Sequence, residues 1–253
     1  MSEAVLRERR GRILVITINR PEARNAANKA VAEGLAAACD ELDDTPELSV
    51  GVLTGAGGNF CAGMDLKAFA AGELAYVPGR GLGFTERPPR KPLISAVEGH
   101  AVAGGTELVL ATDLVVAAKD AKFGIPEVKR GLVAAGGGLL RLPHRIPYQK
   151  ALELALTGES FTADQGAQWG FVNVLTEPGE ALDGAIALAE RITVNGPLAV
   201  AVTKEIMVKS AGWSQDEIWS KQGELIAPVF TSHDAREGAI AFAEKRAPNW
   251  TGA

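Results

Sequence analysis

The chain has 253 residues, of which 47% are hydrophobic and 23% charged; this supports a sizeable core and argues against a disordered chain. Its net charge of −5 gives no reason to expect binding to nucleic acid or to an anionic membrane surface. The start of the chain is too charged for a signal peptide, and no apolar run approaches the ~18 residues of a membrane span, so we expect a soluble cytoplasmic protein.

The first part of the chain alternates between strand and helix patterns. A short apolar segment at residues 4–7 precedes the β-branched run Ile13–Asn19, which predicts a strand. A helix is expected from about Asn28, a good N-cap residue. Further strands are predicted at 49–54, 92–97 and 114–118, with a short helix at 108–112. This alternation indicates an α/β architecture.

The second part of the chain is mostly helical. Helical patterns cover residues 151–156, 179–191, 198–209, 213–226 and 233–245, and only 171–175 is typical of a strand. Residues 70–90 form a long, weakly periodic segment that contains glycine and proline. Loops of this length in compact domains are often functional or mobile.

A glycine-rich segment, Gly55 to Leu66, follows a predicted strand and leads into a helix. Such a turn can bring backbone N–H groups close to a ligand. Taken alone, an ordinary β–α connection explains it more economically. The glycine spacings of a dinucleotide-binding loop and of a phosphate-binding loop are both absent from this segment.

Two acidic residues lie where the surrounding sequence argues against charge. Glu107 follows the glycine pair Gly104-Gly105, and between Gly99 and Ala118 the only other formal charge is Asp113. A helix beginning at these glycines would offer free N–H donors for an oxyanion. A first-turn acid that complements the helix dipole explains Glu107 equally well when it is considered alone.

The second acid, Glu127, follows Phe123-Gly-Ile-Pro126. Taken alone, it is better explained as a surface residue that pairs with Lys129 or Arg130. Two carboxylates beside glycine and proline turns nevertheless suggest acid–base chemistry on a small molecule. The two cysteines and three histidines show no metal-ligand spacing, so no metal site is expected.

Five segments in order resemble the crotonase, or enoyl-CoA hydratase, superfamily. They are 19–26, 60–66, 104–108, 123–127 and 241–246, and both glutamates together point to the hydratase branch. The resemblance implies a crotonase fold, a spiral of ββα repeats in residues 1–195, followed by a C-terminal helical trimerisation region in residues 196–253. It also implies a homotrimer or homohexamer, an acyl-CoA substrate, a role in fatty acid metabolism, and no cofactor apart from the coenzyme A of the substrate.

The resemblance also implies roles for individual residues. The backbone N–H groups of Met64 and Gly104 would hold the thioester oxygen, and Glu107 and Glu127 would be the catalytic glutamates. We assign Glu107 to the activation of water and Glu127 to proton delivery. Residues Ala62, Asp65, Leu66 and Arg24 would lie along coenzyme A, and Phe242 and Lys245 would reach it, often from a neighbouring subunit.

The expected reaction is reversible hydration of a trans-2-enoyl-CoA to a 3-hydroxyacyl-CoA. The ending Glu244 to Trp250 and the triplet Asp65-Leu-Lys67 also resemble hydratases of crotonobetainyl-CoA, also called carnitinyl-CoA hydratases. Other acyl-CoA isomerases or hydrolases of the same fold, and a non-catalytic acyl-CoA-binding subunit, are the remaining alternatives. The chain departs from the hydratase pattern at Ala103, usually glycine, and at Ala134-Ala135, usually Pro-Gly, which bears on substrate size.

Overall fold

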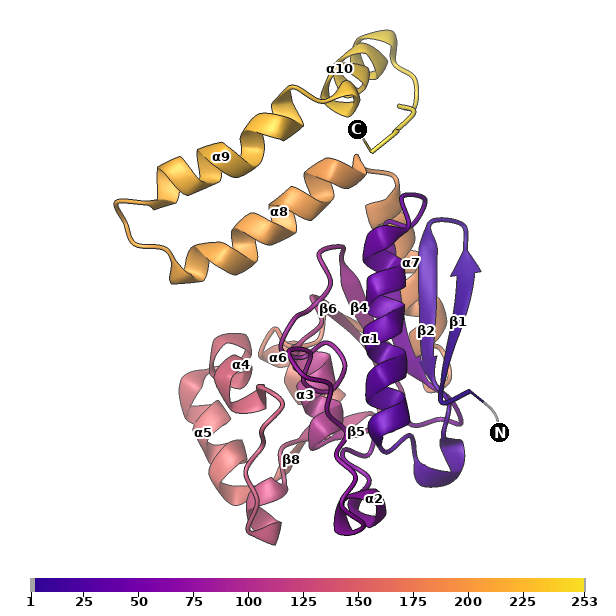
Figure 1. The fold of residues 1–253 in the computed structure, drawn as a ribbon, viewed down its shortest axis with the longest axis vertical. Helices are drawn as coiled ribbons and strands as arrows, with labels where there is room; N and C mark the ends of the chain where they lie inside the picture. Colours follow the sequence, from indigo (N-terminus) through magenta and orange to yellow (C-terminus); the bar gives the residue numbers. More distant parts are fainter. Residues whose placement is uncertain (1–2, 253) are drawn as a thin grey trace.

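A six-stranded sheet forms the centre of the fold in the computed structural model, which describes residues 3–252 (Figure 1). The strand order is β1-β2-β3-β4-β6-β9, in which β1 and β2 form an antiparallel hairpin and the remaining pairs are parallel. The strands are β1 (Val5–Arg10), β2 (Ile13–Ile18), β3 (Val50–Gly55), β4 (Leu93–Val97), β6 (Leu114–Ala118) and β9 (Val174–Thr176). The central strands are continuous apolar runs because both faces of the sheet are covered.

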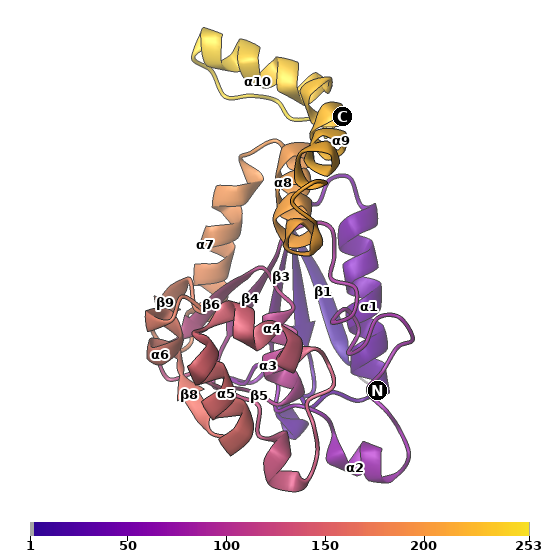
Figure 2. The same ribbon diagram turned by 90° about the vertical axis from the view of Figure 1, so that its left-hand side faces the viewer.

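The two faces of this sheet are covered by different helices. Strand β2 shows the division, since Leu14, Ile16 and Ile18 pack in one cluster with helix α1 (Lys29–Asp44). Its alternate residues Ile13 and Val15 pack on the other face, in a cluster with helix α7 (Ala181–Thr193). Figure 2 shows the sheet edge-on between these two helices.

A second, three-stranded sheet and several short helices form the lower part of the molecule in Figure 1. Its strands are β5 (His100–Val102), β7 (Lys122–Gly124) and β8 (Ser160–Thr162). The helices of this part are α2 (Leu66–Ala70), α3 (Gly104–Leu110), α4 (Gly138–Arg145), α5 (Tyr148–Thr157) and α6 (Ala163–Gln168), with short 3₁₀ helices η1 (Pro21–Ala23) and η2 (Glu127–Arg130). The ring of Phe123, from β7, stacks on Phe161 and packs edge-on against Phe171.

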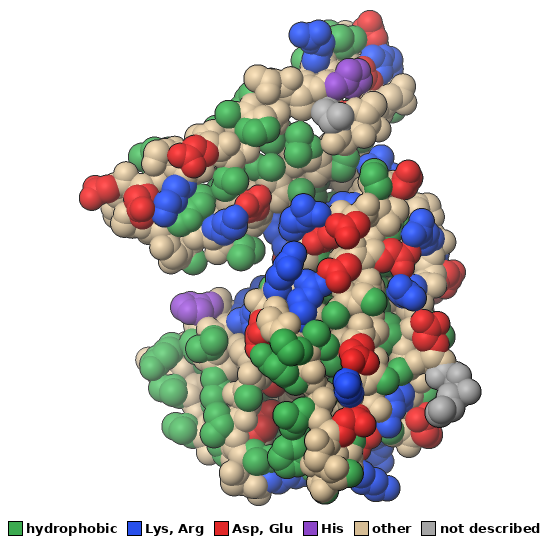
Figure 3. All heavy atoms as spheres, viewed as in Figure 1, with side chains coloured by type: hydrophobic (Ala, Val, Ile, Leu, Met, Phe, Trp, Pro, Cys, Tyr) green, Lys and Arg blue, Asp and Glu red, His purple; other side chains and the backbone are tan. Residues whose placement is uncertain are grey.

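The last three α-helices extend away from the core as an arm (Figures 1 and 2). They are α8 (Pro197–Lys209), α9 (Ile218–Phe230) and α10 (His233–Glu244), with the 3₁₀ helix η3 (Ser210–Gly212) after α8. Large apolar side chains of the arm are exposed, among them Met207 (73%), Trp219 (75%) and Phe230 (77%). Figure 3 shows hydrophobic side chains among the charged ones on the arm, and open space between the arm and the core.

Between residues 3 and 252, no single helix is both long and apolar enough to cross a bilayer. The pair Ala181–Thr193 and Pro197–Gly212 passes by length and composition together, but is bent by 107°.

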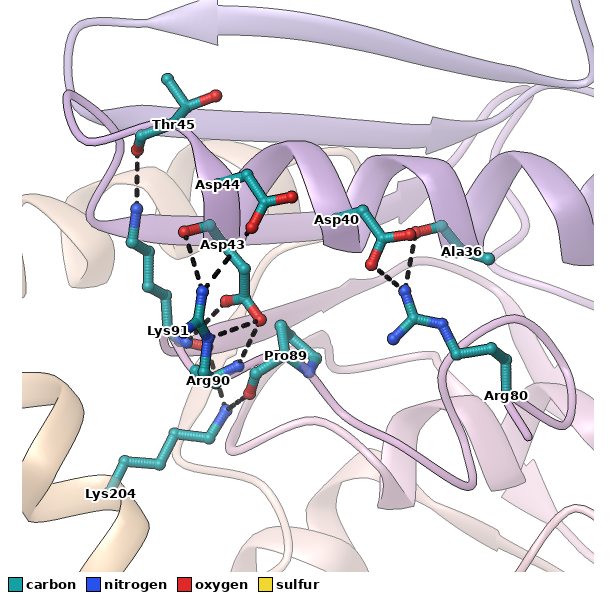
Figure 4. A network of polar contacts seen from close by, with 10 residues as sticks. All are labelled: Ala36, Asp40, Asp43, Asp44, Thr45, Arg80, Pro89, Arg90, Lys91 and Lys204. Carbon is teal, nitrogen blue, oxygen red and sulfur yellow. Dashed lines mark hydrogen bonds and ion pairs between the residues drawn. The ribbon is translucent and has the colours of Figure 1, made fainter.

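A polar network ties residues 80–91 to both α1 and α8 (Figure 4). The Asp43 carboxylate of α1 accepts hydrogen bonds from the backbone N–H groups of Arg90 (2.9 Å) and Lys91 (3.0 Å). From α8, the Lys204 ammonium donates to the backbone oxygens of Pro89 (2.8 Å) and Lys91 (3.0 Å), and to the Asp113 carboxylate (2.6 Å). The end of the long predicted loop is therefore held firmly at two places.

The α/β architecture and the predicted strands of the large sheet are confirmed, but some boundaries were wrong. The helix expected at residues 108–112 is α3, which begins at Gly104 because its glycines are buried against neighbouring backbone. The helix expected from Trp213 begins at Ile218, after a turn at Ser214–Glu217. The division at residues 195 and 196 stays a prediction, and residues 1, 2 and 253 lie outside the described part of the chain.

Candidate active site

A cavity of about 460 Å³ lies between α2 with the segment that follows it, the start of α3, and the segment from η2 to Gly136. Two of its charged lining residues are Glu107 and Glu127, which the structure thus brings to one cavity although they come from different elements. The third is Arg130. Most of the remaining wall is apolar, with Leu74, Leu82 and Leu132 among its residues.

Two backbone N–H groups meet beside this cavity, at Met64 and Gly104. A Cβ atom placed on Gly104 would lie 3.7 Å from the Met64 nitrogen, and one on Gly63 would lie 3.4 Å from the Gly104 nitrogen. Neither amide donates a hydrogen bond to another group of residues 3–252. Both amides are therefore available to a ligand oxygen, and their role as an oxyanion site stays the prediction that the family resemblance implies.

The close approach of the two turns depends on glycine. A Cβ atom on Gly105 would lie 2.1 Å from the carbonyl oxygen of Cys61, and Gly63 has a φ of +91°. The neighbouring residue Ala103 is not glycine, yet it has φ 53° and ψ −126°. L-amino acids rarely adopt this conformation, so the N-terminus of α3 is strained at the residue just before the Gly104 amide.

Glu107 is only 3% exposed, near the start of α3. Its Oε1 accepts a hydrogen bond of 2.9 Å from the Gly138 N–H, at the first residue of α4. Burial raises the pKa of the Glu107 carboxyl, while the amides of Gly138 and Gly136 and the charge of Arg141 oppose that rise. The ionisation of the Glu107 carboxyl therefore depends on Gly136, Gly138 and Arg141.

Glu127, the first residue of η2, has one buried side-chain oxygen, Oε2, without a hydrogen-bond partner among the described residues. Burial raises the pKa of this carboxyl; its own backbone N–H opposes that rise, the nearby charge of Glu107 adds to it, and Arg130 has the smallest, lowering effect. No ion pair joins it to Lys129 or Arg130 within residues 3–252, so the surface interpretation of Glu127 was wrong.

The two glutamates are linked through Thr106, which sequence reasoning missed. Its buried hydroxyl lies 2.6 Å from the Ala101 oxygen and 2.8 Å from the Gly124 oxygen, and it accepts a hydrogen bond of 2.9 Å from the Gly124 N–H. Because Thr106 precedes Glu107 and Gly124 leads into the Glu127 turn, this hydroxyl fixes one glutamate relative to the other.

The residues predicted along coenzyme A form a backbone ladder at one edge of the cavity. The Ala62 N–H donates to the Arg24 oxygen (3.0 Å), the Ala27 N–H to the Gly63 oxygen (2.7 Å), and the Asp65 N–H to the Ala27 oxygen (2.8 Å). The structure therefore places the exposed Arg24 directly beside Ala62.

Asp65 and Leu66 follow this ladder. The Asp65 carboxylate caps α2 through the N–H groups of Lys67 (3.1 Å) and Ala68 (3.2 Å), and pairs with the Arg20 guanidinium at 3.0 Å. Its side chain is thus engaged within the fold, and the pKa of Asp65 is lowered because these contacts outweigh the effect of burial. Leu66 is half exposed and lines the cavity.

Phe242 and Lys245 lie at the end of α10, and the chain does not bring them to its own cavity. Phe242 is 87% exposed, and Figure 1 shows α10 at the opposite end of the molecule from α2. Any contact of these two residues with coenzyme A therefore requires a neighbouring subunit.

Known proteins resemble this chain over its full length. The sequence profile of the family described as "Enoyl-CoA hydratase/isomerase" matches residues 8–253. The enoyl-CoA hydratase EchA19 of Mycobacterium tuberculosis is 43% identical, over 96% of this chain and 94% of its own. The carnitinyl-CoA dehydratase of Salmonella arizonae is 42% identical over 100% of both chains.

Solved structures of hydratases also resemble this chain over its full length. The enoyl-CoA hydratase EchA1 of Mycobacterium marinum is 67% identical, with a TM-score of 0.99 and coverage of 100% of both chains. The carnitinyl-CoA hydratase of Mycobacterium avium is 44% identical over 100% of both chains, with a TM-score of 0.79.

Proposed function

The chain belongs to the enoyl-CoA hydratase/isomerase family and is a hydro-lyase with the crotonase fold; on this premise, we propose that it adds water reversibly to trans-2-enoyl-CoA thioesters to give 3-hydroxyacyl-CoA. One observation carries this proposal: two carboxyl groups of raised pKa, Glu107 and Glu127, line a single cavity beside two amides that have no acceptor among residues 3–252.

The amides of Met64 and Gly104 stabilise the charge that develops during the reaction. Addition of water to the β-carbon moves an electron pair toward the thioester oxygen, in an enolate-like state. Fixed N–H donors aimed at this oxygen do not have to reorganise, and one such donor is often worth ~3–4 kcal/mol of barrier. The position of the Gly104 amide at the N-terminus of α3 adds the positive end of the helix dipole.

The two glutamates divide the proton transfers. We assign Glu107 as the base that takes a proton from water, since the Gly138 amide and Arg141 favour its ionised form. Glu127 is the acid that delivers a proton to the α-carbon, since burial and, to a lesser degree, the charge of Glu107 favour its protonated form. In the reverse reaction the roles exchange. Because these groups move both protons, the reaction requires neither a metal nor a redox cofactor.

The wall of the cavity supports an apolar acyl chain. Beyond the glutamates its large side chains are mainly aliphatic or aromatic, including Leu74, Tyr76, Leu82 and Val133, and its one cationic side chain is Arg130. A trimethylammonium group, as in crotonobetainyl-CoA, would lose water there and be repelled by Arg130, whereas an ionised Glu107 and the rings of Phe69 and Tyr76 would attract it. Carnitinyl-CoA hydration remains the second candidate because relatives of that name are about as similar, at 42% against 43% identity.

The proposal extends to the binding of coenzyme A and to the assembly of subunits. The backbone ladder at Ala62 and Asp65 would receive the adenine end, and Arg24 its phosphates. The exposed apolar side chains of the arm support assembly into a trimer or a pair of trimers, in which residues 196–253 form the contact region. In such an assembly Phe242 and Lys245 would approach the coenzyme A of a neighbouring subunit.

The direct test is the hydration of a panel of trans-2-enoyl-CoA esters, with crotonobetainyl-CoA included, followed by product analysis. The variants Glu107→Gln and Glu127→Gln should each lose activity by ~10²–10⁴-fold, because each removes one proton transfer, while acyl-CoA binding is retained. Glu153→Gln, which changes an exposed glutamate of α5, serves as the control.

Each alternative has a distinct outcome in this test. An isomerised or hydrolysed product would replace the hydratase proposal with another reaction of the same fold. Binding of acyl-CoA without turnover of any thioester would favour a non-catalytic binding subunit. Equal activity of the wild type and both glutamine variants would contradict the assignment of the glutamates.

A further inference from the structure

The glycine turn before α4 lies between the carboxylate of Glu107 and the guanidinium of Arg141. A Cβ atom on Gly136 would lie 2.8 Å from Glu107 Oε2, and one on Gly138 would lie 2.9 Å from Glu107 Cγ. A Cβ atom on Gly137 would instead lie 2.2 Å from Arg141 Nη1. The turn thus contacts the glutamate through its outer residues and the arginine through its middle residue.

Arg141 is fixed in this place by contacts on both sides. Its backbone N–H donates to the Gly137 oxygen (3.1 Å), and its guanidinium donates to the backbone oxygen of Thr85. Thr85 is buried, and its hydroxyl accepts a hydrogen bond from the N–H of Leu82, whose side chain lines the cavity. Arg141 therefore connects the glycine turn to the segment of Leu82, whose side chain lies next to that turn in the cavity wall.

We propose that Arg141 is a positioning residue for the base: it holds the Gly136–Gly138 turn against Glu107 and places its positive charge on the far side of that turn, without touching the substrate. Arg141 does not line the cavity, so its effect passes through Glu107 and the turn. The inference rests on the proposed hydration reaction, in which Glu107 must be ionised to accept a proton from water.

The charges that face Glu107 come from two elements. From α4, Arg141 favours the ionised carboxylate; from η2, Glu127 opposes it, and Arg130 interacts with Glu127. The second arginine of α4, Arg145, donates to the Thr112 oxygen (2.9 Å) and makes no contact with the glycine turn. Removal of Arg141 therefore leaves burial, which raises the pKa of Glu107, opposed only by the amides of Gly138 and Gly136, so the pKa should rise further.

The test compares Arg141→Met, Arg141→Lys and the control Arg145→Met in the pH profile of kcat/KM. The acid limb of the kcat/KM profile reports the ionisation of Glu107, so Arg141→Met should move this limb to higher pH. Activity near pH 7 should fall severalfold and recover at higher pH. Arg141→Lys should keep the position of the limb because it keeps the charge, and Arg145→Met should leave the limb unchanged.

Two results would overturn the proposal. One is an acid limb of Arg141→Met that coincides with the wild type while activity falls equally at all pH values, which would indicate a purely structural role. The other is a limb that moves equally in Arg145→Met. If the wild type hydrates no enoyl-CoA, the proposed function fails instead. The pH dependence of urea unfolding then still tests Arg141, because Arg141→Met should lose more stability than the wild type as pH rises above about 5.

Discussion

Replacement of the strained Ala103 by glycine should stabilise the protein. Ala103 precedes the Gly104 amide and has φ 53° and ψ −126°, a conformation that glycine adopts without a steric penalty. Substitutions of alanine by glycine normally destabilise a protein, so a stabilising effect would be specific evidence for strain at this position.

The magnitude follows from two opposing terms. A non-glycine residue in a sparsely populated backbone conformation costs roughly 1–3 kcal/mol, which Ala103→Gly releases. The greater freedom of glycine in the unfolded chain costs about 0.4–1 kcal/mol. The expected net gain is ~1 kcal/mol, which corresponds to a rise in Tm of roughly 2–4 °C for a chain of this size.

The assay is a pair of thermal melts at equal protein concentration, since assembly would also affect Tm. The matched control is Ala111→Gly, at a buried residue with an ordinary φ of −86°, where a loss of stability is expected. A Tm for Ala103→Gly below that of the wild type by as much as for Ala111→Gly would refute the argument from strain.

Three further predictions concern buried polar groups. Glu127→Gln removes a carboxyl whose pKa is raised in the folded state. The wild type should therefore lose stability relative to this variant as pH rises above the unfolded pKa of about 4.3. Urea unfolding across a pH series measures this difference, and parallel curves of unfolding free energy against pH would contradict it. Thr106→Val should cost roughly 1–3 kcal/mol and lower kcat, while Thr106→Ser keeps most of both, as denaturation and initial rates can measure. Lys204→Met should cost roughly 1–3 kcal/mol in chemical denaturation by leaving Asp113 unpaired, and adding Asp113→Asn should recover part of that loss; additive losses would argue against the pair.

Most of the large sheet could be predicted because its strands are long and apolar. Residues 13–18 and 93–97 form continuous buried runs, which periodicity and β-branched composition identify directly. The strands of the second sheet have only three residues each and no period to detect. The apolar pattern of α3 begins only at residue 108 because Gly104 and Gly105 are poor helix formers; their contact with the 61–64 turn explains glycine at the start that the oxyanion argument required.

The site was predictable where a residue conflicted with its surroundings. Glu107 stood out as a charge in an apolar segment, and the structure places it in the cavity with Glu127. Thr106 and Arg141 gave no such signal, because their partners are contributed by residues distant in the sequence. A threonine beside glycines and an arginine on an amphipathic helix are common in any protein, so their importance follows only from tertiary structure.

The ladder between residues 24–27 and 62–65 is made of main-chain hydrogen bonds. Side-chain substitutions along it leave these bonds in place, so evolution can retain the proposed coenzyme A-binding ladder while the Leu66–Leu82 segment and the residues around Leu132 vary. A new acyl specificity could then arise within this lineage from a few changes in those two regions, with the main-chain ladder unchanged. Relatives named for different acyl groups at nearly equal identity to this chain fit such a modular route of divergence.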